Sequence, residues 1–259
     1  MYAERTYQQL VKEDDLVVTR VIVKETELFI KACVGLEEEA LGSLLKHRKY
    51  IEDYISQYPL FKTALSSYSP NGDAPEIVKE MAVQASKVNV GPMASVAGAI
   101  AEYVGKDLTE FSDELIIENG GDVYIDSKRT RNVCIFAGES IFSKDIKIKI
   151  ESQHMPIGVC TSSGSVGHSM SFGAADAVTV LSKSAVFADA AATAVANMVE
   201  TEEDVERILN FSRKIHNLNG VIIIKNDTLG AWGDFCIERR GEIECQKSGY
   251  EKMNQLIKH

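Results

Sequence analysis

Three polar side chains stand four residues apart in a segment that otherwise reads as buried, residues 185–198 (AVFADAAATAVANM). Asp189, Thr193 and Asn197 share one side of the helix that this composition predicts, because positions i, i+4 and i+8 lie above one another. A buried carboxylate needs a partner, and carboxylate and hydroxyl oxygens are the donors that Mg²⁺ prefers. The residues alone leave two interpretations open: a metal site at Asp189 and Thr193, or a hydrogen-bond network that fixes packing.

A second candidate stretch is residues 160–173 (CTSSGSVGHSMSFG), which holds five serines and three glycines. The hydroxyls and accessible N–H groups of such a loop suit phosphate oxygens, although the Walker pattern G-x-x-x-x-G-K is missing. His168 lies among these small residues, where it could be a catalyst or only a structural hydrogen-bonding residue. Cys160 and His168 could form a thiolate pair, but the sequence supplies no third group to orient it.

The third stretch is Asn119-Gly120-Gly121-Asp122, which separates two segments of alternating β pattern. Paired glycines allow the positive φ angles that a tight hairpin turn requires. The motif could be a turn and nothing more. Alternatively, the two glycines open a flat approach for a planar ligand, with Glu118, Asn119 and Asp122 lining it.

The elements around these stretches predict an α+β fold with helices packed on mixed or antiparallel sheets. A β meander is expected over 5–34, and strands over 114–118, 121–126, 131–137, 144–151, 176–182, 220–226 and 234–246. Helices are expected over 36–57, 75–90, 91–105, 185–198 and 202–216. Because no linker divides the chain, we expect one domain over 1–259, with two loosely similar β-rich halves at about 1–112 and 113–259.

Composition limits the classes of ligand and the location. The chain has 259 residues and a formal net charge of −10, which argues against a nucleic-acid partner. An anionic ligand would therefore need a metal ion, a helix N-terminus or backbone amides. The five cysteines include no C-x-x-C pair, the N-terminus is polar, and no apolar run reaches about 18 residues. These features predict a cytoplasmic protein with no membrane segment and no disulfide framework.

Together and in this order, ENGGDVYI, CTSSGSVGH and DAVTVLSKSAVFADAAATAV resemble the motifs of the ApbE superfamily, the FAD-dependent protein flavinyltransferases. Over about residues 5–245 the chain is similar to an ApbE-related group without an assigned function. ApbE enzymes cleave the pyrophosphate of FAD with Mg²⁺ and attach FMN to a Thr or Ser of a target protein. The resemblance therefore implies an ApbE-like fold, FAD or FMN as ligand, and Mg²⁺.

The resemblance also assigns roles to residues of this chain. It implies that Asp189 and Thr193 bind the metal, and that His168 matches the catalytic histidine. The implied cofactor-binding residues come from the other two motifs: Asn119, Gly120, Gly121, Asp122, Thr161, Ser162, Ser163 and Gly164.

The chain departs from the transferase pattern in the motif of the catalytic histidine. The family has Asp three residues after that histidine, whereas this chain has Ser171. Loss of a positioned base typically lowers a rate about 10²–10⁴-fold.

The expected function is therefore an ApbE-like flavin or nucleotide pocket of unproven activity. One alternative is an active Mg²⁺-dependent FAD pyrophosphatase or FMN transferase with another base, Asp122 or Asp176. Another is a non-catalytic partner protein, for example in anaerobic sulfur assimilation.

Overall fold

The computed structural model describes residues 15–138, 140–143, 145–164, 173–239 and 242–246. Its helices are α1 (Glu37–Gln57), α2 (Leu60–Thr63), α3 (Glu76–Ser86), α4 (Val96–Leu108), α5 (Ala185–Ala196) and α6 (Asp204–Ser212). Its strands are β1 (Val17–Val23), β2 (Thr26–Ala32), β3 (Leu115–Asn119), β4 (Asp122–Asp126), β5 (Arg131–Cys134), β6 (Ile146–Ile150), β7 (Ile157–Ser162), β8 (Ala177–Ser182), β9 (Gly220–Lys225), β10 (Thr228–Gly233), β11 (Phe235–Arg239) and β12 (Glu242–Gln246).

The strands form two sheets in which every pairing is antiparallel. The larger sheet has the order β1-β2-β3-β4-β7-β8-β9-β10, and the smaller has the order β12-β11-β6-β5. The large sheet runs without a break across the point near residue 112 where the two halves were expected to meet. One sheet therefore joins both halves.

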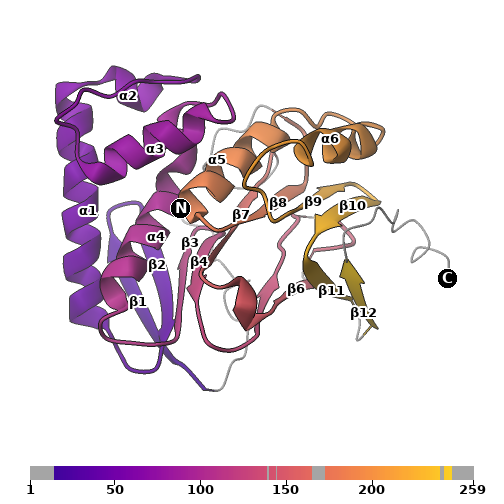
Figure 1. The fold of residues 1–259 in the computed structure, drawn as a ribbon, viewed down its shortest axis with the longest axis horizontal. Helices are drawn as coiled ribbons and strands as arrows, with labels where there is room; N and C mark the ends of the chain where they lie inside the picture. The colour runs from indigo at the N-terminus through magenta and orange to yellow at the C-terminus, as the bar shows by residue number, and fades with distance from the viewer. Residues whose placement is uncertain (1–14, 139, 144, 165–172, 240–241, 247–259) are drawn as a thin grey trace.

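The large sheet is the middle layer of three. Side chains of successive residues point to opposite faces of a strand, and those of every second residue share a face. Leu115 and Ile117 of β3 thus pack under the helices, while Val123 and Ile125 of β4 pack against the small sheet. Figure 1 shows α1, α3 and α4 at one end of the molecule and β11 and β12 at the other, with α5 between α3 and α6. Two cores result, one on each face of the large sheet.

The predicted α+β class and the antiparallel sheets are confirmed, and the differences from the sequence expectations are local. The β meander is confirmed for β1 and β2, while residues 5–14 lie outside the described residues. Strand β10 and the short helix α2 were not predicted. The sequence indicated no disulfide framework, yet Cys236 is disulfide-bonded, and its register partner across β11 and β12 is Cys245. Within the described residues, no helix is long and apolar enough to cross a membrane.

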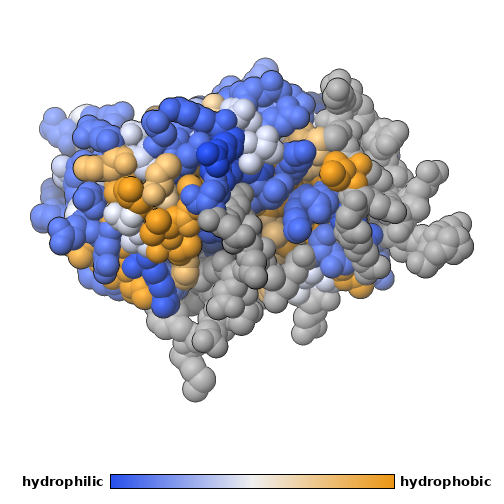
Figure 2. Space-filling view, turned by 90° about the horizontal axis from the view of Figure 1, so that it is seen from below, coloured by the Kyte–Doolittle hydropathy of each residue, from blue (hydrophilic) through white to orange (hydrophobic). Residues whose placement is uncertain are grey.

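Strand β1 forms one edge of the large sheet, since among the described residues it pairs only with β2. Three of its apolar side chains, Val17, Val18 and Ile22, are 46%, 58% and 54% exposed. Figure 2 shows apolar surface at the end of the molecule that carries β1 and β2. Arg20, in the middle of the strand, forms an ion pair with Glu27 of β2. The edge is therefore largely apolar, and its charge is neutralised within the chain.

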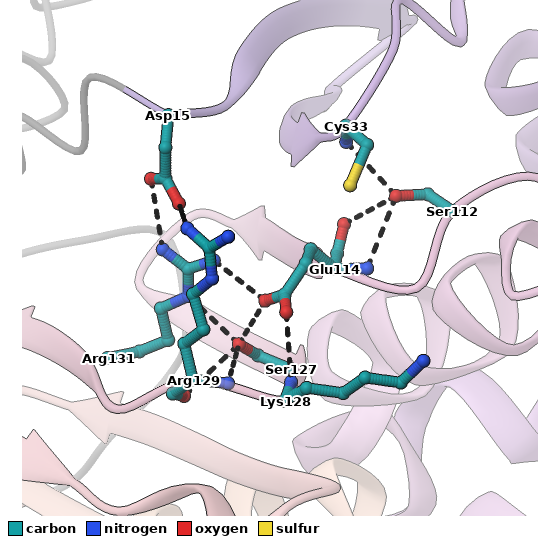
Figure 3. Close-up of polar contacts among 8 residues, drawn as sticks. All are labelled: Asp15, Cys33, Ser112, Glu114, Ser127, Lys128, Arg129 and Arg131. Atoms are coloured by element: carbon teal, nitrogen blue, oxygen red, sulfur yellow. Dashed lines mark hydrogen bonds and ion pairs between the residues drawn. The ribbon is translucent and has the colours of Figure 1, made fainter.

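A buried ion-pair network ties together the open end of the β3–β4 hairpin (Figure 3). Glu114, just before β3, receives hydrogen bonds from Arg131 Nη2 at 2.7 Å, from the Lys128 N–H at 3.2 Å and from the Ser127 hydroxyl. Arg131 also contacts Asp15 at 3.3 Å. Burial raises the pKa of Glu114, but the hydrogen bonds from Ser127 and Arg131 and the charge of Arg131 outweigh it, so the pKa lies below its usual range.

Candidate functional site

The β3–β4 turn has the geometry that its glycines predict. Gly120 and Gly121 have φ angles of 68° and 108°, and Asn119 pairs with Asp122 across the two-residue turn. Two consecutive positive φ angles are the mark of a type I′ turn, which glycine adopts without steric cost. A Cβ added at Gly121 would meet no atom of the described residues within 4 Å. The hairpin is therefore confirmed, with open space beside the second glycine.

The first turn of α4 connects this hairpin to α5. The Asn119 side-chain amide donates to the Ala97 carbonyl at 3.1 Å, and the Gly98 N–H donates to Asp189 Oδ2 at 2.9 Å. The N–H groups in the first turn of a helix have no partner within the helix, and its positive dipole end favours a carboxylate. Asp189 of α5 therefore caps α4, one residue away from the contact with Asn119.

Close packing explains the small residues of α4 and α5. A Cβ added at Gly98 would lie 2.3 Å from the Ala185 carbonyl oxygen and 2.8 Å from Asp189 Cβ. A Cβ added at Gly158 of β7 would lie 2.3 Å from Ala185 Cα. Only glycine fits at either position, because such distances are far below van der Waals contact. The small residues at these positions therefore serve the close packing of α4, α5 and β7.

Asp122 begins β4 and lies opposite Cys160 of β7. Its side chain is buried, and its Oδ1 atom has no hydrogen-bond partner among the described residues. Burial raises the pKa of Asp122 to about 7, and the charge of Glu118 adds to this, although hydrogen bonds from the Cys160 thiol and the Thr161 N–H act in the opposite direction. A carboxyl with such a pKa can gain or lose a proton near neutral pH.

Asp189 is the second buried carboxyl of this region. Burial raises its pKa well above the usual range, and the negative charge of Asp122 raises it further, against the hydrogen bonds from the Gly98 and Ala97 N–H groups. Two carboxylates this close in a medium of low dielectric constant cannot both ionise without a compensating cation or proton. A proton or a bound cation near Asp122 and Asp189 would therefore be strongly favoured.

Cys160 lies between the two carboxyls. Its thiol donates to the Ala185 carbonyl at 3.4 Å, one turn before Asp189 on α5. Burial raises the pKa of the Cys160 thiol, and the charges of Asp122 and Asp189 raise it further. The thiol is therefore held protonated, which argues against the thiolate pair with His168. His168 itself lies outside the described residues.

The residues at the end of β7 point in different directions. The Thr161 hydroxyl is 2.9 Å from the Thr179 hydroxyl on β8, on the face away from Cys160. Ser162, on the same face as Cys160, is buried, and within the part of the chain that the structure describes its Oγ atom has no hydrogen-bond partner. The structure thus brings Ser162 toward the face that carries Asp122 and directs the Thr161 side chain to the opposite face.

The remaining predicted residues border this region. Ser163 is buried, and the Gly164 N–H donates to the Ala175 carbonyl at 2.9 Å. Thr193 is 6% exposed on α5, one turn beyond Asp189. Among the described residues, no group of three or more His, Cys, Asp or Glu side chains is arranged to hold a metal ion. Any cation here would therefore use hydroxyl, carbonyl, water or ligand oxygens beside the carboxylates.

Sequence reasoning missed one buried carboxylate that contacts α5. Glu102 of α4 accepts hydrogen bonds from the Ser184 hydroxyl at 3.0 Å and the Val186 N–H at 3.2 Å. A signal was present, because Glu102 is the one acidic residue inside the small, apolar run GPMASVAGAIAEYVG. Its partner could not be read from that run, since Glu102 and Val186 are 84 residues apart.

The chain matches known proteins in sequence and in fold. A family model described as AbpE bacteria matches residues 8–214. A UPF0280 protein of Methanocaldococcus jannaschii is 40% identical over 83% of this chain and 89% of its own length. A UPF0280 protein of Methanococcus vannielii is 39% identical over 85% of this chain and 91% of its own length.

Two solved structures have a similar fold at low sequence identity. The flavinyl transferase ApbE of Pseudomonas stutzeri, in its apo form, is 13% identical, with a TM-score of 0.54 over 83% of this chain and 93% of the other. The ApbE protein of Thermotoga maritima is 12% identical, with a TM-score of 0.52 over 90% and 97%. The predicted ApbE-like fold is confirmed by these matches.

Proposed function

Because the chain belongs to the family described as AbpE bacteria, we propose that it binds a flavin or adenine nucleotide with a divalent cation between the β3–β4 turn, α4 and α5. One observation carries the proposal: Asp122 and Asp189 are both buried next to Cys160. The charge of Asp122 raises the pKa of Asp189, and the charges of both carboxyls raise the pKa of the Cys160 thiol. A bound cation would satisfy this pair, and the phosphates of a nucleotide would complete its coordination.

The residues fit Mg²⁺ by their chemistry. Asp189 offers a carboxylate and Thr193 a hydroxyl one helical turn away, and both are buried. Mg²⁺ is commonly held by one or two carboxylates together with water and substrate phosphates. Asp189 and Thr193 would hold the ion, which would neutralise phosphate oxygens when bound. The unpartnered Oδ1 of Asp122 adds negative charge on the same side.

The flavin part of the ligand fits best beside the hairpin turn. Gly120 and Gly121 present backbone without side chains, and the space next to Gly121 is open. Ser162, with its unpartnered hydroxyl, is the better candidate for a phosphate contact than Thr161, whose hydroxyl is already paired with Thr179. Asn119 holds the turn against α4 through its bond to Ala97.

We expect binding to be retained while FAD cleavage is absent or very slow, because Ser171 replaces the family's carboxylate beside His168. One observation favours the alternative of an active pyrophosphatase: the pKa of Asp122 is raised to about 7, which suits a general base. If that alternative holds, Asp122 would take over the proton transfer.

A flavin titration tests the proposal. The full chain is titrated with FAD at increasing Mg²⁺, binding is followed by flavin fluorescence, and AMP and FMN are measured by chromatography. Thr193→Val should weaken the Mg²⁺ dependence, whereas Thr179→Val, which removes a hydroxyl on the opposite face of the sheet, should not. Release of AMP by the unmodified chain would favour the active enzyme. Release of AMP only by the Ser171→Asp variant would support the expectation that Ser171 makes FAD cleavage absent or very slow. Absence of any flavin or nucleotide binding would contradict the proposal and favour the partner protein.

A further inference from the structure

Helices α4 and α5 cap one another through two buried carboxylates. Asp189 of α5 accepts from the Gly98 N–H at the start of α4, at 2.9 Å. Glu102 of α4 accepts from the Val186 N–H at the start of α5, at 3.2 Å. Each helix therefore supplies the carboxylate that satisfies a free N–H group and the positive dipole end of the other.

The Glu102 contact extends to the N-cap of α5. The Ser184 hydroxyl donates to Glu102 Oε2 at 3.0 Å and accepts from the Phe187 N–H at 3.3 Å. The second carboxylate oxygen of Glu102 contacts Lys106 Nζ at 2.7 Å. Glu102 is only 4% exposed. Its carboxylate thus fixes where α5 begins, one turn before Asp189.

The packing around these caps transmits any shift of α5. The backbone of Ala185 lies against Gly98 on one side and Gly158 on the other, and a Cβ at either glycine would overlap it. A helix held this closely has no free room to move its first turn without moving its second. The position of Asp189 relative to α4 therefore depends on the Glu102 contact.

We propose that Glu102 is a positioning residue, which holds the Asp189 carboxylate against α4 and thereby sets the affinity of the cation site at Asp189 and Thr193. The cation part of this inference rests on the proposed function. Residues that orient metal ligands without touching the metal typically change metal affinity about 10–100-fold when they are removed. We therefore expect Glu102→Ala to weaken cation binding by about tenfold or more.

Mn²⁺ is a suitable probe, because it is paramagnetic and accepts the same oxygen ligands as Mg²⁺. The full chain and its variants are titrated with Mn²⁺ by electron paramagnetic resonance, under conditions where circular dichroism shows each to be folded. Glu102→Ala should bind about tenfold more weakly, and Glu102→Gln, whose amide oxygen can still accept from Val186 N–H, should recover most of the affinity. Glu114→Gln is the matched control, since it alters a buried carboxylate outside the site. Wild-type affinity in folded Glu102→Ala would overturn the inference.

Amide hydrogen exchange separates this inference from the proposed function, because it needs no metal. Loss of Glu102 removes the acceptor of the Val186 N–H, so exchange there must accelerate. If Glu102 positions Asp189, exchange at Gly98 N–H must accelerate as well, although Glu102 does not touch it. Acceleration at Val186 alone would show that Glu102 caps α5 without positioning Asp189, and the inference would fail. If exchange accelerates at both amides in Glu102→Ala but the wild-type chain binds no Mn²⁺, the positioning role of Glu102 is supported and the cation site is contradicted.

Discussion

Two buried carboxyls at opposite ends of the β3–β4 hairpin differ in what surrounds them. Glu114 at the open end and Asp122 at the turn are each 8% exposed. Arg131 and Ser127 hold the pKa of Glu114 below its usual range, whereas burial and the charge of Glu118 raise the pKa of Asp122 to about 7. The two residues are equally exposed, yet their pKa values shift in opposite directions. The Asp122 carboxyl is more deeply desolvated, and Glu114 has the guanidinium of Arg131 and hydrogen bonds from Ser127 and Lys128.

This difference separates a structural role from a functional one. The Glu114 carboxylate is satisfied within the chain, because Arg131, the Ser127 hydroxyl and the Lys128 N–H all donate to it (Figure 3). The Asp122–Asp189 pair has hydrogen bonds from backbone N–H groups and a thiol, which do not neutralise two charges. Unsatisfied buried charge is uncommon outside functional sites. The comparison therefore favours the turn end of the hairpin as the site.

The largest expected effect comes from breaking the buried ion pair between Arg131 and Glu114. Arg131→Met removes the guanidinium and leaves Glu114 buried without its counter-charge, which should lower the free energy of unfolding by about 3–5 kcal/mol. Urea denaturation measures this loss. The affinity for Mn²⁺, measured on the folded fraction, should not change. A loss below about 1 kcal/mol would show that Glu114 is better solvated than its burial indicates.

The next largest effect comes from replacing Asp189, one of the two buried carboxyls at the turn end of the β3–β4 hairpin. Wild-type protein should be stabilised by Mg²⁺, by about 2.7 kcal/mol when the free ion is at 100 times its Kd. Asp189→Asn should abolish this stabilisation and leave the metal-free protein no less stable. The amide oxygen still accepts from the Gly98 N–H, and the amide is uncharged, as is the protonated acid that the raised pKa of Asp189 favours. Asp126→Asn, at the far end of β4, is the matched control and should respond to Mg²⁺ as the wild type does. Thermal melts with Mg²⁺ and with EDTA distinguish the three proteins.

The pH dependence should have opposite signs at the two ends of the hairpin. Because the folded pKa of Asp122 lies above its unfolded value, the folded state holds the extra proton, and stability falls as pH rises from about 4 toward about 7. For Glu114, whose folded pKa is lowered, stability is lost instead as pH falls below its unfolded value.

Metal-free protein should therefore lose about 1 kcal/mol between pH 6 and pH 7 through Asp122. Asp122→Asn should remove that slope, and saturating Mg²⁺ should reduce it. Denaturation at a series of pH values in EDTA measures both. An unchanged slope in Asp122→Asn would assign the proton to another group.

The sequence predicted local geometry well and tertiary partners poorly. The turn at Gly120 and Gly121 and the ridge of Asp189 and Thr193 follow from spacing, because a paired glycine and a four-residue repeat determine backbone and face without reference to the rest of the chain. Strand alternation also indicates that Thr161 and Ser162 point to opposite faces, although the motif resemblance grouped them. Cys160 was noticed for a thiolate role and not as the neighbour of two carboxyls.

The remaining partners depend on chain segments that meet only after folding. Glu114 and Arg131 are separated by 17 residues, and Glu102 and Val186 by 84. No local pattern distinguishes a glutamate that will meet an arginine from one that will cap a distant helix. For the same reason, the sequence identified Asp189 as a buried carboxylate but not the first turn of α4 as its partner.

The smallest expected effect concerns Lys106, which forms an ion pair with the capping carboxylate of Glu102. It sharpens the comparison with Arg131. Lys106 contacts Glu102 Oε1 at 2.7 Å as an i,i+4 pair, but its side chain is 56% exposed, whereas that of Arg131 is 3% exposed. Exposed pairs of this kind contribute about 0.3–0.5 kcal/mol, since water screens them and the lysine loses side-chain freedom. Lys106→Met should therefore lower stability by no more than about 0.5 kcal/mol in urea denaturation.

Because Glu102 Oε2 still caps α5 in this variant, amide hydrogen exchange at Gly98 and the affinity for Mn²⁺ should stay at the wild-type values. A loss as large as that of Arg131→Met would mean that Glu102 depends on its exposed lysine as strongly as Glu114 depends on Arg131. The distinction between satisfied and unsatisfied carboxylates would then have to include exposed partners.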